Sequence, residues 1–262
     1  MPTSTPLAAN CGQNTMKKHG NFAFKSDIGK VRETNEDVAL ALANRTGDIL
    51  LLVCDGMGGH SRGDLAAKMA SDYLSDAFKA KNSFFTMGTA RLWLTYHIKQ
   101  ANRLIYDEAT RNPKAKEMGT TLTAVLLVDK QMAIANLGDS RAYMIGKDGL
   151  KQLTEDQTYV DYLFRMGKIT REEMKTHPQK HVLLNALGLN PTISFDLQIK
   201  GHQGERIMVC SDGLYNNVSD IELLTVLVSS DTPAQKCDSL IRIANANGGS
   251  DNIAIALWEQ GK

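Results

Sequence analysis

The spacing of apolar residues changes along this chain. Short apolar runs predict strands, and segments with helical spacing predict helices. A short apolar run at 48–56 (DILLLVCDG) ends in a turn signal and is typical of a buried strand. Helical spacing follows at 61–81 and again at about 88–109, and we expect both helices to pack in the core. Their apolar positions are Leu65, Met69, Tyr73 and Ala77 beside Ala66, Ala70, Leu74 and Phe78, then Leu92, Tyr96, Ile98, Ala101, Leu104 and Ile105.

Three further strands are predicted in the middle of the chain, at 120–129, 131–138 and 140–146. The first two are joined by a polar turn at Asp129-Lys130, and GKDG at 146–149 is typical of a hairpin. Connections this short favour antiparallel pairing over strand–helix–strand crossovers.

Further strands and helices are predicted in the last part of the chain, after a polar segment that has neither pattern. A polar segment of mixed character runs from about Thr154 to Pro191. Strands resume with ISFDLQIK and RIMVCSDG, two helical stretches lie at about 219–229 and 233–247, and NIAIALW is the last strand. Paired helices beside several hairpins predict an α+β layered sandwich, not a doubly wound parallel sheet.

No repeat or low-complexity linker divides the sequence, so we expect one domain at 21–262 after a flexible polar leader at 1–20. The leader has no apolar stretch of signal-peptide length and no basic residue before Lys17, so we do not expect secretion.

Composition narrows the class of protein. The 262 residues are 42% hydrophobic and 23% charged, with a net charge of +1, so neither nucleic acid nor an anionic membrane is an expected partner. The four cysteines, Cys11, Cys54, Cys210 and Cys237, have no metal-type spacing. We expect Cys54 and Cys210 to be small buried thiols, and scattered cysteines favour a reducing cytoplasm.

Acidic residues occur beside predicted apolar strands, most of them next to glycine. Asp55 and Asp212 each follow an apolar run and precede a glycine. Asp139 lies between two strands, Asp251 comes directly before the last strand, and Glu36-Asp37 precede another apolar run. Each such aspartate alone is typical of a turn or a cap.

Carboxylates at the ends of core strands need positive charge nearby, and Arg32 and Arg141 are the obvious basic candidates. If the strands lie side by side, the acids converge and require a cation. Oxygen ligands without a histidine or cysteine cluster suit Mg²⁺ or Mn²⁺ better than Zn²⁺. A turn-and-cap interpretation and a metal-site interpretation both remain open from the pattern alone.

These residues lie in motifs that resemble the metal-dependent serine/threonine protein phosphatases of the 2C type, in their compact bacterial form. The resemblance extends from about Asn21 to Trp258 and its motifs occur in the family order. They are SDIGKVRETNEDV, VCDGMGGH, GTTLTAVLL, NLGDSRAY, LTEDQT, GKITREEMKTHP, NALG, VCSDGL and GGSDNIAIAL. The resemblance implies a four-layer α-β-β-α sandwich of two antiparallel sheets flanked by helix pairs, with the segment at about 154–191 as a flap.

The resemblance also implies hydrolysis of phosphoserine and phosphothreonine esters by a water or hydroxide that bridges two Mn²⁺ or Mg²⁺ ions. Asp55 would bridge the two ions and the Gly56 carbonyl would bind the second. Asp212 and Asp251 would bind the first ion, Glu36 the second, and Asp37 would support them. Asp139 and Asp212 would hold a possible third ion. Arg32 matches the family arginine that binds the phosphate, in place of its alternative as a solvated surface residue.

The sequence departs from the family pattern at the proton donor. Eukaryotic members carry a histidine where this chain has Met57, whose thioether cannot donate a proton. The donor is therefore unassigned, and water at a metal ion is the candidate. We expect the nearby His60 to be a turn or supporting residue.

Two departures fall in the flap. The family's Asp-His-Ser is Asp156-Gln157-Thr158, and Asn185 replaces an arginine. These changes concern flap contacts and substrate preference.

Two other functions compete with an active phosphatase. A catalytically dead binding module would need a broken metal site, and every principal acid is present. A nucleotide-binding module would need a phosphate-binding glycine motif that the sequence lacks. The expected partners are phosphorylated proteins and a cognate Ser/Thr kinase, with the chain as a cytoplasmic monomer.

Overall fold

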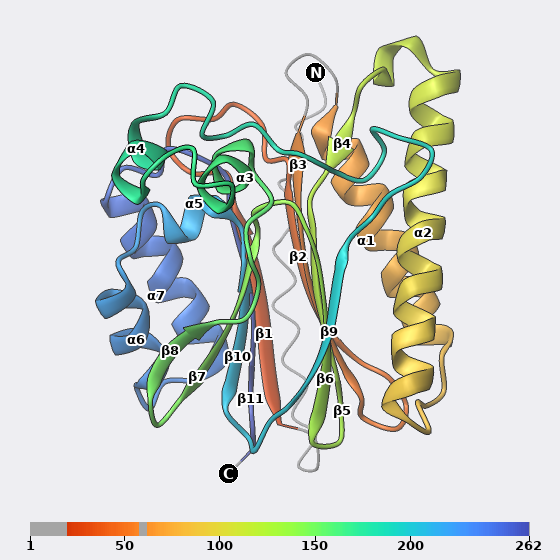
Figure 1. The fold of residues 1–262 in the computed structure, drawn as a ribbon. Coiled ribbons are helices and arrows are strands. Elements are labelled where there is room, and N and C mark those ends of the chain that lie inside the picture. The colour runs from red at the N-terminus through yellow and green to blue at the C-terminus, as the bar shows by residue number, and fades with distance from the viewer. Residues whose placement is uncertain (1–19, 58–61, 262) are drawn as a thin grey trace, which may run out of the picture.

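Two antiparallel sheets lie face to face with helices on both outer sides, so the chain forms four layers (Figure 1). This computed structural model describes residues 20–57 and 62–261. The α+β class and the four-layer α-β-β-α order predicted from the sequence are confirmed. The division into a leader at 1–20 and one domain at 21–262 stays a prediction, because residues 1–19 lie outside the described part.

Each sheet combines strands from distant parts of the sequence. The first sheet has the order β1 (Asn21–Asp27), β11 (Ile253–Glu259), β10 (Arg206–Cys210), β7 (Arg141–Gly146) and β8 (Gly149–Gln152). The second has the order β2 (Asp37–Ala43), β3 (Ile49–Met57), β5 (Leu122–Val128), β6 (Gln131–Leu137) and β9 (Asp196–Gly201), with β4 (Gly119–Thr120) beside β3. The last strand, β11, thus pairs with the first strand, β1, and with β10.

Helices cover the outer faces of both sheets, as Figure 1 shows. The second sheet carries α1 (Gly63–Ala80) and α2 (Met87–Arg111), and the first carries α6 (Asp220–Val228) and α7 (Pro233–Ala246). The four-residue α5 (Asp212–Tyr215) follows β10, and a 3-10 turn (Pro113–Ala115) follows α2. The predicted flap at about 154–191 contains α3 (Tyr159–Arg165) and α4 (Arg171–Thr176).

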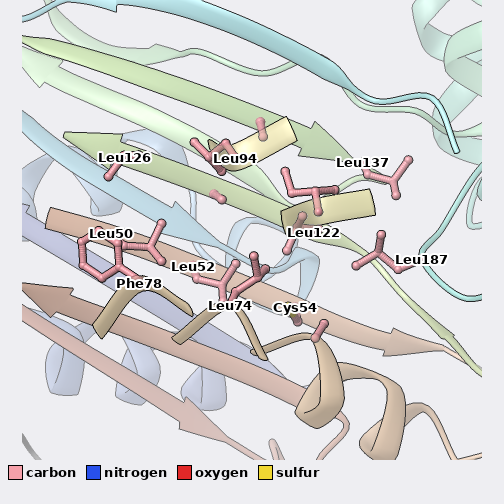
Figure 2. Close-up of a cluster of buried hydrophobic side chains, with 14 of the residues drawn as sticks. Leu50, Leu52, Cys54, Leu74, Phe78, Leu94, Leu122, Leu126, Leu137 and Leu187 are labelled. Carbon is pink, nitrogen blue, oxygen red and sulfur yellow. The ribbon is translucent and has the colours of Figure 1, made fainter. Parts of the chain in front are cut away.

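Strand periodicity accounts for the layers, because alternate residues of one buried strand serve two cores. In β3, Leu50, Leu52 and Cys54 face α1 and α2, where they pack with Leu74 and Phe78 (Figure 2). The intervening Ile49, Leu51 and Val53 pack between the sheets. A third apolar cluster lies between the first sheet and α6 and α7.

One part of the predicted core is wrong. Leu92, Tyr96 and Leu104 of α2 are exposed, whereas Ile98 and Ile105 are buried. Only one face of α2 packs against α1 and the sheet, so the second apolar row of this helix remains at the surface. The periodicity established that a helix forms but did not identify the packed face.

Two further findings concern composition. Cys54 and Cys210 are buried free thiols, as predicted. Across residues 20–57 and 62–261, the helices lack the combination of length and apolar character that crossing a membrane requires.

Close backbone contact brings α5 and the start of β11 together. A Cβ atom added at Gly213 would lie 1.9 Å from the Asn252 carbonyl oxygen, a distance that no real side chain tolerates. The neighbours of these two residues, Asp212 and Asp251, are therefore brought together by a position that only glycine can occupy.

We predict that Gly213→Ala lowers the free energy of unfolding by about 1–3 kcal/mol, because the new methyl group pushes α5 away from β11. Gly88→Ala in α2 is the matched control, since the nearest neighbour of the added Cβ atom would be Thr86 Oγ1, at an ordinary contact distance of 3.6 Å. Alanine is the better helix former, so this control should be neutral or stabilising by up to about 1 kcal/mol. Urea unfolding of both variants measures the difference. Equal stabilities would contradict the close contact.

Candidate active site

Acidic side chains from both sheets surround one cavity of about 670 Å³ at the end of the sandwich. The lining includes seven of the eight residues that the sequence nominated, namely Arg32, Glu36, Asp55, Gly56, Asp139, Asp212 and Asp251. The eighth, Asp37, is buried beside the cavity, where its backbone pairs with that of Asp55. Residues more than two hundred positions apart in the sequence therefore share one site.

Two threonines fix the end of β3 that carries Asp55. The Thr121 hydroxyl accepts a hydrogen bond from the Asp55 amide at 3.0 Å, and the Thr120 hydroxyl donates to the Asp55 carbonyl at 3.0 Å. The Thr121 amide donates to the same carbonyl at 2.8 Å. Asp55 thus has a fixed backbone from which its carboxylate reaches the cavity.

Asn252 braces the loop that carries Arg32 and Glu36. Its side-chain oxygen accepts from the Glu36 amide at 2.8 Å, and its Nδ2 donates to the carbonyls of Ile28 and Thr34, each at 2.9 Å. Because Asn252 directly follows Asp251 and is buried, it ties the first segment of the site to the last.

Asp37 is a buried carboxylate held by a hydroxyl group. The Ser211 hydroxyl donates to Asp37 Oδ2 at 2.5 Å and accepts from the Ala254 amide at 2.9 Å. Ser211 therefore connects β2 to β10 and β11 directly behind the cavity.

Arg32 provides positive charge at the cavity. Its Nη2 donates to Asp251 Oδ2 at 2.8 Å, and this bond raises the pKa of the guanidinium. The side chain is otherwise exposed to solvent. Arg141, the other basic candidate, instead forms a bidentate pair with Asp156 of the flap, at 2.7–3.0 Å, and stacks on Tyr215.

The site carboxylates are costly to ionise together. Burial raises the pKa of Asp37 to about 7, and the charges of Asp212 and Asp251 add to it. Burial and the charge of Asp212 raise the pKa of Asp139 to about 7. Burial raises the pKa of Asp212 to about 6, with Asp251 contributing, and places the pKa of Asp55 well above its usual range. Both burial and like charge favour a bound cation.

The donor chemistry fits hard divalent ions, since the described lining residues offer carboxylate oxygens and the Gly56 backbone and include no cysteine. Among residues 20–57 and 62–261, no three acidic, histidine or cysteine side chains form a ready-made metal-binding group. The ion pair between Arg32 and Asp251 satisfies one of these carboxylates instead. The carboxylates thus line one cavity, but no three of those described are close enough together to bind a single ion as they stand.

Comparison with known proteins identifies the family. A family model described as protein phosphatase 2C matches residues 30–257, most of the chain. The chain belongs to the protein phosphatase 2C family. The resemblance predicted from the sequence motifs is confirmed, and the chain is a serine/threonine phosphatase of this type.

Bacterial relatives cover nearly the whole chain. The serine/threonine phosphatase stp of Listeria innocua is 39% identical over 238 residues, which are 90% of this chain and 94% of the relative. Protein phosphatase PhpP of Streptococcus pneumoniae is 34% identical over 241 residues, 90% of this chain and 96% of the relative.

Solved structures agree with the fold. Serine/threonine phosphatase Stp1 from Staphylococcus aureus has a TM-score of 0.86 at 36% identity, covering 95% of this chain and 98% of its own. The catalytic domain of the phosphatase PstP, solved with two manganese ions, has a TM-score of 0.79 at 31% identity, covering 91% and 96%.

Three supporting residues of this phosphatase were missed by sequence reasoning, namely Thr121, Ser211 and Asn252. Each lies inside a quoted motif directly beside a nominated acid or strand end, so proximity in a motif was the available signal. Their roles depend on contacts across the fold that no local pattern contains. His60 lies outside the described residues.

The two flap departures have structural partners. The Gln157 side chain accepts from the Gly138 amide at 3.2 Å and donates to Asp196 at 2.9 Å, while Thr158 caps α3. Asn185 donates to the Ser194 carbonyl at 2.8 Å. In this phosphatase Gln157 thus ties the flap to β9 of the second sheet, and Asn185 bonds to the segment just before β9.

We predict that Asp37→Asn changes how the stability of the metal-free protein depends on pH. Asp37, whose pKa is raised to about 7, retains its proton in the folded state. Its contribution to the free energy of unfolding is therefore fully present at about pH 4 and is lost as pH rises towards 7. Asparagine does not titrate, so in EDTA at pH 8 the variant should be more stable than the wild type by on the order of 2 kcal/mol.

Urea unfolding at pH 5 and pH 8 in EDTA measures this effect. Asp72→Asn is the control, because Asp72 is an exposed residue of α1 that pairs with Lys68. An identical pH dependence in the wild type and Asp37→Asn would contradict the assignment.

Proposed function

We propose that this chain hydrolyses phosphoserine and phosphothreonine esters at a binuclear Mn²⁺ or Mg²⁺ centre in the carboxylate-lined cavity. The convergence of five of the nominated carboxylates and one arginine on this cavity carries the proposal. Asp55 would hold both ions and the Gly56 carbonyl the second, while Asp212 and Asp251 would hold the first ion and Glu36 the second. Asp37, hydrogen-bonded to Ser211, would support Asp55 from behind.

A pair of divalent ions, when bound, makes a water molecule a strong nucleophile at neutral pH and neutralises charge on the phosphoryl group. The residues of the chain supply orientation. The planar guanidinium of Arg32 is placed to bind phosphoryl oxygens at the cavity, and substrate would compete with Asp251 for its hydrogen bonds. Attack by water needs no serine or cysteine nucleophile from the protein.

We propose two core ions and a weaker third ion held by Asp139 and Asp212. The manganese pair in the PstP relative supports the core pair. Both aspartates also line a second cavity of about 520 Å³, which adjoins the first, so they are accessible from two sides. Both Mn²⁺ and Mg²⁺ accept oxygen ligands, so this set of carboxylates suits either ion.

The biological setting is proposed from the family and from composition. Phosphorylated proteins are the substrates, and the enzyme reverses the action of a Ser/Thr kinase in bacterial signalling. The buried thiols of Cys54 and Cys210 are compatible with a reducing cytoplasm. A net charge of +1 gives no reason to expect nucleic acid or a membrane as a partner. We propose that the enzyme acts as a monomer.

We predict Mn²⁺-dependent hydrolysis of p-nitrophenyl phosphate and of a phosphothreonine peptide, abolished by EDTA. Asp212→Asn should lower kcat by about 10³-fold or more, because core and third ions both depend on this carboxylate. Asp148→Asn, in the exposed hairpin between β7 and β8, is the control and should retain wild-type kcat. Protein that binds Mn²⁺ but hydrolyses neither substrate would favour a binding module instead.

We expect Arg32→Ala to raise KM about tenfold or more for both substrates with a smaller change in kcat, because the phosphate loses a charged hydrogen-bond donor. Arg32→Lys should restore only part of the loss, since lysine lacks the bidentate fork. Arg91→Ala removes an exposed arginine from α2 and serves as the control. Steady-state kinetics at saturating Mn²⁺ gives both constants. An unchanged KM in Arg32→Ala would mean that the phosphate is held elsewhere.

A further inference from the structure

The reaction needs a proton at a place where the sequence offers no obvious donor. When the phosphorus–oxygen bond of a serine or threonine ester breaks, its electron pair remains on the ester oxygen, which is strongly basic and must be protonated. Met57 lines the cavity near Asp55 and cannot supply a proton. The carboxylates must be ionised to bind metal, and Arg32 does not release its proton.

A histidine of the flap lies at the cavity. His181 lines the carboxylate cavity together with Arg32 and Asp55, and it is the one histidine among the described residues that do so. It is exposed, so it lies where the cavity opens to solvent and where the protein part of a substrate must remain. Imidazole is the side chain that ordinarily exchanges a proton near neutral pH.

His181 also lies where two cavities meet. The second cavity, of about 520 Å³, shares four lining residues with the first, namely Asp139, His181, Asp212 and Ser250. A phosphopeptide could bind with its phosphate among the carboxylates and its peptide chain in the second cavity. The ester oxygen that connects the two parts would then lie beside these shared residues. Lys175 and Lys180 line only the second cavity, so neither lies at the junction that His181 occupies.

The backbone around His181 is fixed relative to the metal site. The Tyr159 amide donates to the Val182 carbonyl at 2.8 Å, and the Leu184 amide donates to the Gln157 carbonyl at 3.0 Å. The Gln157 amide in turn donates to the Gly138 carbonyl at 3.0 Å, next to Asp139. His181 therefore stands on a segment that backbone hydrogen bonds tie to the site in two steps.

We propose that His181 is the general acid that protonates the leaving oxygen of the serine or threonine. Its imidazolium gives a proton to the ester oxygen as the phosphorus–oxygen bond breaks, which releases the alcohol. The neutral imidazole recovers a proton from the water that attacked phosphorus, directly or through solvent, so the products are alcohol and inorganic phosphate. This inference rests on the proposed phosphatase reaction.

Leaving groups of different basicity test the role. p-Nitrophenolate leaves without a proton, whereas phenolate and threonine alkoxide need one increasingly. We expect His181→Gln to lower kcat on a phosphothreonine peptide by about 10²-fold, at the lower end of the usual effect of a general acid. Its kcat on p-nitrophenyl phosphate should change less than about threefold, and KM should change little for either substrate. Phenyl phosphate should fall between the two.

His177→Gln is the matched control, because His177 belongs to the same flap segment but lines neither cavity. It should leave the ratio of peptide to p-nitrophenyl phosphate turnover unchanged. Thermal unfolding and the Mn²⁺ concentration for half-maximal activity report whether either variant disturbs the fold or the metal site.

Equal losses on all substrates, or no loss on any, would overturn the proposal and leave water as the donor. A rise in KM alone would make His181 a phosphate-binding residue and would also overturn it. Failure of the unmodified enzyme to hydrolyse p-nitrophenyl phosphate would refute the proposed function instead.

Discussion

Asp37 and Asp55 face each other across the first strand pair of the second sheet, and Asp212 and Asp251 approach the same region from the first sheet. Burial and their mutual charge raise the pKa of Asp37, Asp55 and Asp212, so these groups resist simultaneous ionisation. The favourable energy that holds them together must come from elsewhere in the molecule. A metal-dependent phosphatase uses this arrangement because the same repulsion that destabilises the metal-free site contributes to binding the ions.

Apolar packing supplies that energy. Three hydrophobic clusters fill the spaces between the four layers, and β3 contributes alternate residues to two of them before it reaches Asp55. Uncharged side chains also hold the site residues in position. Thr121, Ser211 and Asn252 each satisfy backbone or carboxylate atoms at the site. The division is physically sensible, because hydrophobic burial is insensitive to the pH and metal content that govern the carboxylates.

The features of this molecule that the sequence predicts are those that depend on residues close together in the chain. The apolar run of β3, the tight hairpins and the acids beside glycine are each recognised from a few consecutive residues. The family motifs then indicated that the acids share one site. The exposed row of α2 was missed because Leu92 and Tyr96 have the same helical spacing as the buried Ile98 and Ile105. His181 was missed for another reason, since nothing near it in sequence indicates that the flap lies beside residues from six other segments.

The position of β11 has a consequence for synthesis of the enzyme. This strand follows all the other strands of both sheets in the sequence, yet it inserts between β1 and β10, and the residues just before it include Asp251 and Asn252. A nascent chain that lacks them has no partner for Arg32 and no brace for the loop of Glu36. A chain in which β11 has not yet been synthesised therefore lacks part of the carboxylate site, and the site is completed only when β11 inserts into the first sheet.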